Sequence, residues 1–290
     1  MSEPDLLGPT SHTYVSQRLR LHYADWGNRD APPLLLVHGG RDHSRSWDWV
    51  AQELRRDWRV IAPDLRGHGD SAWSPDGSYS ISGYLYDLAQ LIHQQQLEPV
   101  TIVAHSLGGG IALRYAGLYP EKVRKMVVIE GVGLNARAGS TSSAAQLQGV
   151  WRRWIDERRG LSARLPRRYA TIEEALDRMR TENRYLSAEQ ALHLTIHGAS
   201  RNEDGTYSWK FDNYVRSGPP VDITAEDQAA LWGAITCPVL LCWGKKSWAQ
   251  DPTDRAALFQ NAKVAGFEDA GHWLHHDQFD AFVATLRDFL

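Results

Sequence analysis

The sequence predicts an α/β protein built on a mostly parallel sheet with helices on both faces. Short β-branched and apolar runs alternate with helical stretches along most of the 290 residues, as in folds where a helix follows each strand. Several runs, such as residues 34–37 and 239–243, are continuously apolar, which is typical of strands buried on both faces. The length fits either two domains or one α/β domain with an insertion.

The same alternation gives the expected position of each element. Strands are expected at residues 14–17, 19–25, 34–38, 60–63, 100–104, 125–129, 239–243 and 262–268. Helices are expected at residues 47–54, 81–95, 107–118, 255–260 and 278–290. The last helix carries Phe279, Phe282, Val283, Leu286 and Leu290 at helical spacing, so it should bury one face.

Between residues 132 and 234 the alternation stops, and helix signals replace it. Thr171 is followed three residues later by Glu174, and Ser187 by Gln190, which is the pattern of a capping box at a helix start. This stretch is therefore expected to be an inserted set of helices.

We accordingly divide the chain into a core of residues 1–131 and 235–290 and an inserted helical cap, or lid, of residues 132–234. Within the cap, residues 202–212 contain Asp204-Gly205 and fit either a small hairpin or an exposed loop.

Composition excludes several classes of protein. There are 32 Lys and Arg against 35 Asp and Glu, so no basic surplus points to nucleic acid or to an anionic membrane surface. The apolar runs are far shorter than the roughly 20 residues that a membrane helix needs. Residues 1–10 lack the basic start and apolar stretch of a secretory signal. Cys237 and Cys242 lie about 16 Å apart along one strand, too far for a disulfide. We expect a cytoplasmic protein.

Four motifs, each at the end of an expected strand, carry the candidate chemistry. They are residues 36–40 (LVHGG), 62–71 (APDLRGHGDS), 103–109 (VAHSLGG) and 269–273 (DAGHW). In the third motif Ser106 lies between a strand and a helix with small neighbours, which is the context of a nucleophile elbow. The glycine-rich turn of the first motif can aim backbone amides at an oxyanion. The fourth supplies His272 late in the chain.

Taken in this order, the motifs resemble those of α/β-hydrolase fold enzymes with a cap inserted after the sixth strand, and the resemblance extends from about Tyr14 to Leu290. It implies an eight-stranded sheet, a serine, acid and histidine triad, and no metal or organic cofactor. Ala104 stands where the usual GxSxG motif has its first glycine, and alanine is small enough for the close approach. Epoxide hydrolases and haloalkane dehalogenases of this fold use an aspartate nucleophile, so Ser106 argues against both.

A serine hydroxyl needs a base within hydrogen-bond reach, and the base needs an acid that fixes its tautomer. The resemblance implies Ser106 as nucleophile and His272 as base. The acid is less obvious, because Ser247 occupies the place where most of the family carries an aspartate. Glu130, at the end of the sixth strand, is the favoured acid, since some members of the fold carry theirs there. Asp251, in a loop after the seventh strand, is the alternative.

The oxyanion hole and the pocket can also be assigned. The backbone amide of Leu107 should be one oxyanion donor, and the amide of Gly40 the other, with that of Arg41 as the alternative. Aromatic side chains near the turns facing the site predict a hydrophobic pocket for a small molecule. The tryptophans assigned to it are Trp47, Trp248 and Trp273.

The function expected is that of a serine hydrolase that cleaves a carboxylic ester or lactone through an acyl-enzyme. One alternative is a carbon–carbon bond hydrolase of the same fold. The basic character of residues 151–184, which hold ten arginines against six acids, supports this alternative. The other alternative is a non-catalytic, receptor-like homologue, which the serine at position 247 suggests.

Overall fold

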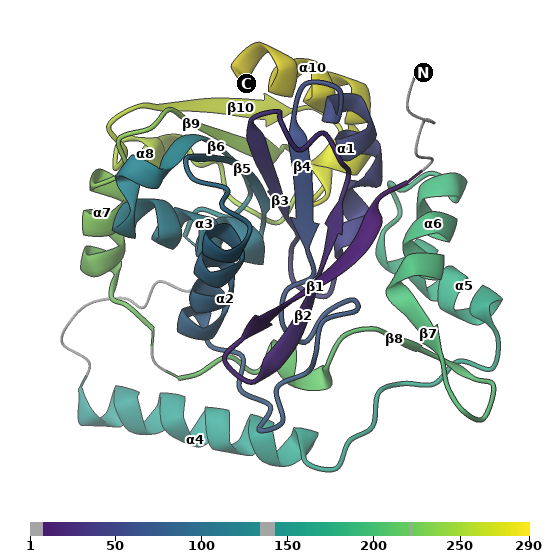
Figure 1. Cartoon of the computed structure of the whole chain (residues 1–290). Coiled ribbons are helices and arrows are strands. Elements are labelled where there is room, and N and C mark those ends of the chain that lie inside the picture. The colour runs from purple at the N-terminus through teal and green to yellow at the C-terminus, as the bar shows by residue number, and fades with distance from the viewer. Residues whose placement is uncertain (1–7, 134–142, 221) are drawn as a thin grey trace, which may run out of the picture.

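The computed structural model describes residues 8–133, 143–220 and 222–290, and it confirms the expected eight-stranded sheet (Figure 1). The strand order across the sheet is β1-β2-β4-β3-β5-β6-β9-β10. These strands are β1 (Thr10–Ser16), β2 (Leu19–Asp25), β3 (Pro33–Val37), β4 (Arg59–Pro63), β5 (Val100–His105), β6 (Val123–Ile129), β9 (Val239–Gly244) and β10 (Ala262–Phe267). Residues 1–7 lie outside the described residues, and with them most of the segment used to predict that there is no secretory signal.

The sheet is mostly parallel, as predicted. β1 pairs antiparallel with β2, and β2 antiparallel with β4, whereas every pair from β4 to β10 is parallel. After β3 the chain moves to one side, to β4, and then returns to place β5 on the other side of β3. The carboxyl ends of β3 and β5 therefore flank the point where the winding direction reverses, which is where open α/β sheets bind ligands.

Helices cover both faces of the sheet because side chains on successive strand residues point to opposite faces. Leu34 and Leu36 of β3 pack in one buried cluster, and Leu35 and Val37 in the other. The first cluster lies under η1 (Ser44–Trp47), α1 (Asp48–Leu54), α9 (Leu274–Asp277) and α10 (Phe279–Phe289). The second lies under α2 (Ile81–Gln94), α3 (Leu107–Leu118), α7 (Ala225–Gly233) and α8 (Thr253–Ala256).

Most expected helices are confirmed, and one is misplaced. The helix expected at residues 255–260 is the short α8, which begins two residues earlier, directly after Pro252, and ends at Ala256. The final helix buries Phe282, Val283 and Leu286, as its spacing predicts. A short turn, η2 (Pro120–Lys122), links α3 to β6.

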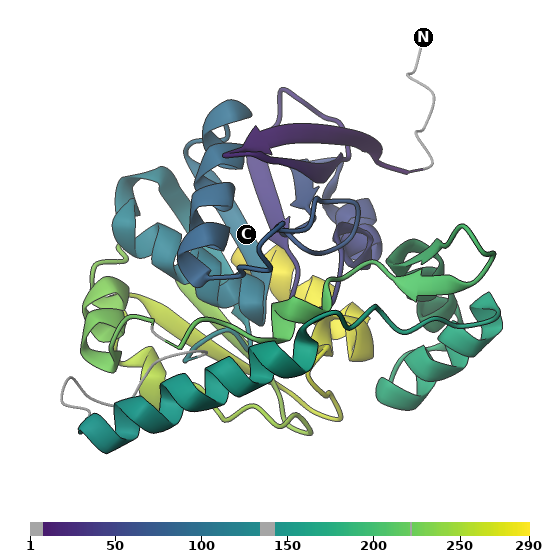
Figure 2. The same ribbon diagram turned by 90° about the horizontal axis from the view of Figure 1, so that it is seen from below.

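The segment between β6 and β9 holds helices and one hairpin. They are α4 (Ala144–Leu161), α5 (Ile172–Glu182), α6 (Ala188–Gly198), β7 (Ala199–Arg201), β8 (Tyr207–Trp209), η3 (Asn213–Arg216) and α7. The hydroxyls of Thr171 and Ser187 cap α5 and α6, as predicted. Of the two readings of residues 202–212, the hairpin is the one observed. In Figures 1 and 2, α4 runs apart from the sheet, and Arg158 near its end binds the backbone of residues 76–77.

Two further properties concern membranes and cysteines. Within the described ranges, no helix combines the length and the apolar character needed to cross a membrane. Cys237 and Cys242 are both buried free thiols, but Cys237 lies two residues before β9 and not in the same strand as Cys242.

A glycine lets α3 approach β3 closely. A Cβ atom on Gly108 would lie 2.5 Å from the carbonyl oxygen of His38 and 2.7 Å from that of Val37. Because both neighbours are backbone atoms at a strand end, neither can move aside without shifting the sheet. Gly149, an exposed residue of α4, would have nothing within 4 Å of an added Cβ.

We therefore expect Gly108→Ala and Gly149→Ala to change stability in opposite directions. Gly108→Ala should destabilise the protein by about 1–3 kcal/mol through overpacking. Gly149→Ala should stabilise it by up to about 1 kcal/mol, because alanine lowers the entropic cost of helix formation. Urea unfolding of both variants measures this. Equal effects of the two changes would contradict the close approach of α3 to β3.

Candidate active site

The candidate site lies at the carboxyl ends of β3 and β5. Ser106 follows β5 directly and precedes α3, with φ 51° and ψ −114°. This left-handed conformation is strained for a residue with a side chain and persists only where the surroundings enforce it. The Ser106 amide donates to the carbonyl of Ile129 at 2.8 Å, and Gly109 and Gly131 approach so closely that a Cβ on either would clash. These contacts fix the turn on the β6 side, and the close approach of Gly108 to the end of β3 fixes it on the other side.

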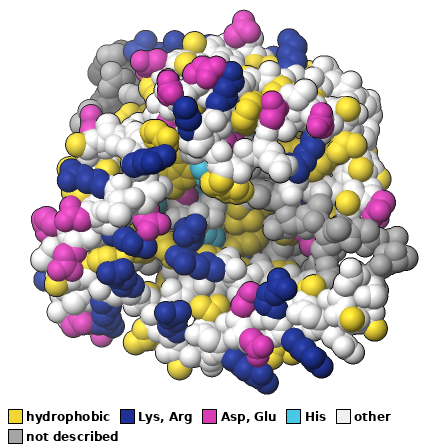
Figure 3. All heavy atoms as spheres, turned by 180° about the vertical axis from the view of Figure 1, so that it is seen from behind, with side chains coloured by type: hydrophobic (Ala, Val, Ile, Leu, Met, Phe, Trp, Pro, Cys, Tyr) yellow, Lys and Arg dark blue, Asp and Glu magenta, His cyan; other side chains and the backbone are white. Residues whose placement is uncertain are grey.

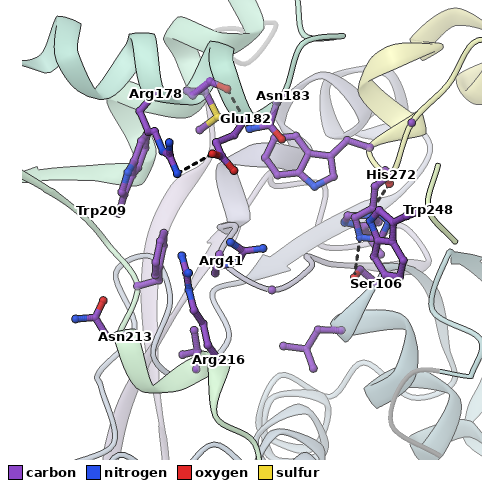
Figure 4. Close-up of a pocket in the computed structure, with 18 of the residues that line it drawn as sticks. Arg41, Ser106, Arg178, Glu182, Asn183, Trp209, Asn213, Arg216, Trp248 and His272 are labelled. Carbon is purple, nitrogen blue, oxygen red and sulfur yellow. Dashed lines mark hydrogen bonds and ion pairs between the residues drawn. The ribbon is translucent and has the colours of Figure 1, made fainter. Parts of the chain in front are cut away.

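Three side chains distant in the sequence form one chain of hydrogen bonds. The Ser106 Oγ lies 3.0 Å from His272 Nε2 (Figure 4), and His272 Nδ1 lies 2.5 Å from Glu130 Oε2. A carboxylate can only accept, so Nδ1 carries a proton and donates it. In the neutral imidazole, Nε2 then presents its lone pair to the serine hydroxyl.

The Glu130 carboxylate is fully buried but well paired. Its side chain is 0% exposed, against 23% for that of His272. Besides His272, it accepts the amide of Gly244 at 2.8 Å and the hydroxyl of Ser247 at 2.7 Å. These three donors satisfy the carboxylate oxygens in place of the water that burial removes. Ser247, which stands in the usual place of the acid, thus donates to the acid on the neighbouring strand.

Asp251 does not reach His272. It accepts hydrogen bonds from Thr253 in an exposed turn, and these bonds lower the pKa of its carboxyl. The structure therefore brings the first of the two proposed acids, Glu130, to the histidine and leaves the second in solvent.

Two further residues, not singled out from the sequence, support the loop of His272. His105 Nε2 lies 2.9 Å from the His272 carbonyl oxygen, and burial lowers the pKa of His105 well below its usual value, so it is a neutral donor. Asp277 accepts the amide of Gly271 at 2.8 Å, and burial raises its pKa to about 6. The available signal for His105 was its position next to Ser106 at the end of β5, where it lines the same pocket.

The residues assigned to the oxyanion hole line the same pocket. A Cβ on Gly39 would lie 2.6 Å from His105 Nδ1 and 3.2 Å from Ser106 Cβ, so only glycine lets this turn approach the serine. Gly40 and Leu107 both line the pocket, as does Arg41. Leu107 is the first residue of α3, where amides have no acceptor within the helix and the helix dipole is positive.

The pocket above Ser106 has a volume of about 1010 Å³. Figure 3 shows a hollow on this side of the molecule, with histidine side chains inside it. Trp248 and Trp273 line the pocket, and the Trp248 ring lies 4.7 Å from that of His272. Further aromatic residues of its wall are Tyr79, Tyr84, Tyr169, Tyr185, Trp209 and Phe211.

The pocket position predicted for Trp47 is wrong. Its side chain is 0% exposed, stacks on His275 at 4.7 Å and belongs to the cluster under α1 and α10. Trp47 ends η1, which lies over a face of the sheet, so its ring packs down onto the sheet instead of towards the strand ends.

Two groups of side chains in the described residues have the spacing of metal ligands, and both lie outside the pocket wall. In one, Asp48, His193 and His197 come together, but the Arg45 guanidinium already binds Asp48 at 2.7 Å and lies 3.4 Å from His197. The other comprises His22, Asp64 and Asp70, and there Asp64 accepts from His22 and from two backbone amides. Structural hydrogen bonds thus already use these atoms.

Known proteins resemble this chain over most of its length. A serine hydrolase-like protein of Danio rerio is 26% identical over 289 residues, covering 91% of this chain and 83% of the relative. A 3-hydroxybutyrate-oligomer hydrolase of Cupriavidus necator is 30% identical over 243 residues, covering 79% and 77%. The solved structure of a Mycobacterium tuberculosis esterase matches in fold, with a TM-score of 0.76 and 23% identity over 97% of this chain and 91% of that one.

A family model matches most of the chain and agrees with the sheet order and the strand-end motifs described above. The model described as the alpha/beta hydrolase fold matches residues 32–279, from the start of β3 to the start of α10. This span contains the turn after β3, the serine after β5 and the histidine after β10. The chain belongs to the alpha/beta hydrolase fold family.

Proposed function

We propose that this hydrolase is a serine esterase that cleaves a carboxylic ester or lactone through an acyl-enzyme. The single observation that carries the proposal is the hydrogen-bonded chain from Ser106 through His272 to Glu130, which ends at the pocket. The relatives named as an esterase and as an oligomer hydrolase agree with ester chemistry.

In this mechanism Ser106 Oγ attacks the carbonyl carbon of the ester while His272 Nε2 takes the hydroxyl proton. The tetrahedral oxyanion is held by the amides of Gly40 and Leu107, at the positive end of α3. As the bond to the alcohol breaks, His272 returns the proton to the leaving oxygen. Water then loses a proton to His272, attacks the acyl-enzyme and releases the acid and the free serine.

Glu130 acts through His272. Its negative charge stabilises the imidazolium that forms during both steps, and its hydrogen bond to Nδ1 holds the ring with Nε2 towards the serine. The receptor-like alternative was suggested by the lack of a carboxylate at position 247. With Glu130 as the acid, that lack no longer argues against catalysis.

We infer that residues 132–234 act as a cap over the pocket. Gly40, Ser106 and His272 supply the core side of the wall, while Tyr169 and Trp209 supply the opposite side from the inserted segment. An aromatic wall of this kind suits an ester with an apolar part and excludes water from the reacting atoms.

The first test is burst kinetics with 4-nitrophenyl acetate. The wild type should release about one equivalent of nitrophenol per chain before the steady state, because acylation precedes deacylation. Ser106→Ala should show no burst, and Asp251→Asn, an exposed control outside the site, should keep it. A burst of equal size in Ser106→Ala would refute the nucleophile.

The second test identifies the acid. Glu130→Gln should lower kcat by about 10⁴-fold, by analogy with triad-acid replacement. Asp251→Asn should change kcat by less than about tenfold. Steady-state kinetics on one ester, with circular dichroism to check folding, makes the comparison. The opposite ranking would transfer the role of the acid to Asp251.

The third test concerns Ser247, which positions Glu130. Ser247→Ala should lower kcat by about tenfold with little change in KM, because one hydrogen bond to a charged group is lost. Combining Glu130→Gln with Ser247→Asp should recover at least about tenfold of the lost kcat, since a carboxylate returns to the neighbourhood of His272 Nδ1. If the double variant is no faster than Glu130→Gln, the electrostatic role assigned to this carboxylate is wrong.

A further inference from the structure

The wall of the pocket carries more positive than negative side chains. Its cationic residues are Arg41, Arg167, Arg178, Arg184, Arg216 and Lys246. Its acidic residues are Glu182, Asp222 and Asp277. The close-up in Figure 4 shows several of these charges projecting into the space beside Ser106.

The acids do not neutralise this surplus. Asp222 forms an ion pair with Arg114 at 2.7 Å, and Glu182 pairs with Arg178 at 2.6 Å. Asp277 has its pKa raised to about 6 by burial and already accepts the amide of Gly271. Asp222 and Glu182 are thus paired with other arginines, and Asp277 carries less negative charge near neutral pH than an ordinary carboxylate.

Arg41 and Arg216 differ from the other arginines of the wall. Arg178 has a carboxylate partner, and Arg167 and Arg184 each lie over a tyrosine ring, at 5.1 Å from its centroid. Among the residues that the structure describes, no side-chain hydrogen bond, ion pair or ring contact is found for Arg41 or Arg216.

The two guanidinium groups also repel one another. Burial, and then the charge of Arg216, lowers the pKa of Arg41, while the charge of Glu182 raises it by a smaller amount. The two cations therefore lie close enough to interact. Figure 4 shows both side chains reaching into the space between the Ser106–His272 pair and the Arg178–Glu182 pair. An anion between them would relieve the repulsion and accept several charge-assisted hydrogen bonds.

The position of Arg41 relates this anion to the reaction. Arg41 follows Gly40, whose amide is a proposed oxyanion donor, and has φ 63°. The anion therefore lies within one arginine side-chain length of the oxyanion turn, in the same pocket as Ser106. A short acyl chain with a terminal carboxylate spans such an interval.

We propose that Arg41 and Arg216 form a carboxylate subsite, so that the preferred substrate is the ester of a short dicarboxylic acid, with its free carboxylate between these two arginines. This inference rests on the proposed esterase function for its reaction. The binding of the carboxylate itself depends only on the pocket.

The experiment compares monomethyl glutarate with its uncharged counterpart, in which a primary amide replaces the free carboxylate. Hydrolysis is followed by proton release. The wild type should prefer the anionic ester by at least about tenfold in kcat/KM, since charge-assisted hydrogen bonds are stronger than neutral ones. Arg216→Gln and Arg41→Gln should each reduce this preference by about tenfold, chiefly through KM, and added salt should reduce it too.

Arg180→Gln is the matched control. Arg180 is exposed on α5, two residues from Arg178, and is not part of the pocket wall. Its replacement removes one positive charge from a helix that contributes to the pocket wall, without changing the wall itself, and should leave the preference within about twofold. An equal decrease in Arg180→Gln would show that net charge alone attracts the ester, and would overturn the subsite.

Binding to Ser106→Ala separates the two proposals. Dissociation constants of the same two esters, from ligand-observed NMR, should favour the anionic one, and Arg41→Gln or Arg216→Gln in that background should remove the difference. If the Ser106-dependent burst occurs but neither kinetics nor binding favours the anion, the subsite is wrong and the esterase stands. If no ester is hydrolysed but the arginines still select the anion, the reaction is wrong and the subsite stands.

Discussion

The site depends on one interaction, the hydrogen bond between a buried carboxylate and the histidine beside it. The side chain of Glu130 has no exposure, and its charge is tolerated there because Gly244, Ser247 and His272 all donate to it. This bond selects the tautomer of His272, and the tautomer decides whether a lone pair or a proton faces Ser106. Without the carboxylate, nothing would hold His272 in the tautomer whose lone pair faces Ser106.

The sheet explains how such distant residues meet. Ser106, Glu130 and His272 follow β5, β6 and β10, three parallel strands whose carboxyl ends lie at one edge. The glycine turn after β3 lies across the reversal of winding, next to the serine. Strain at Ser106 is maintained by this packing, since Gly108, Gly109 and Gly131 allow strand and helix backbones to approach closely. The same close packing of strand and helix backbones therefore forms the core and positions the candidate catalytic residues.

Sequence patterns anticipated the parts that depend on local chemistry. Continuous apolar runs located the strands, and the hydroxyls of Thr171 and Ser187 marked two helix starts. What the patterns left open depends on contacts across the sheet. Nothing local distinguishes Glu130 from Asp251 as the partner of His272, because the choice follows from the pairing of β6 with β9. Trp47 was misassigned because nearness to a turn does not determine which way a side chain packs.

The account of this site is tested most directly by the protonation of His272. Nitrogen NMR on protein with labelled histidines, with the signal assigned by comparison with His272→Gln, reports which ring nitrogen carries the proton in the neutral form. We expect it on Nδ1, facing Glu130, with Nε2 unprotonated. A neutral ring that carries its proton on Nε2 would mean that the carboxylate does not orient the histidine, and would contradict the account.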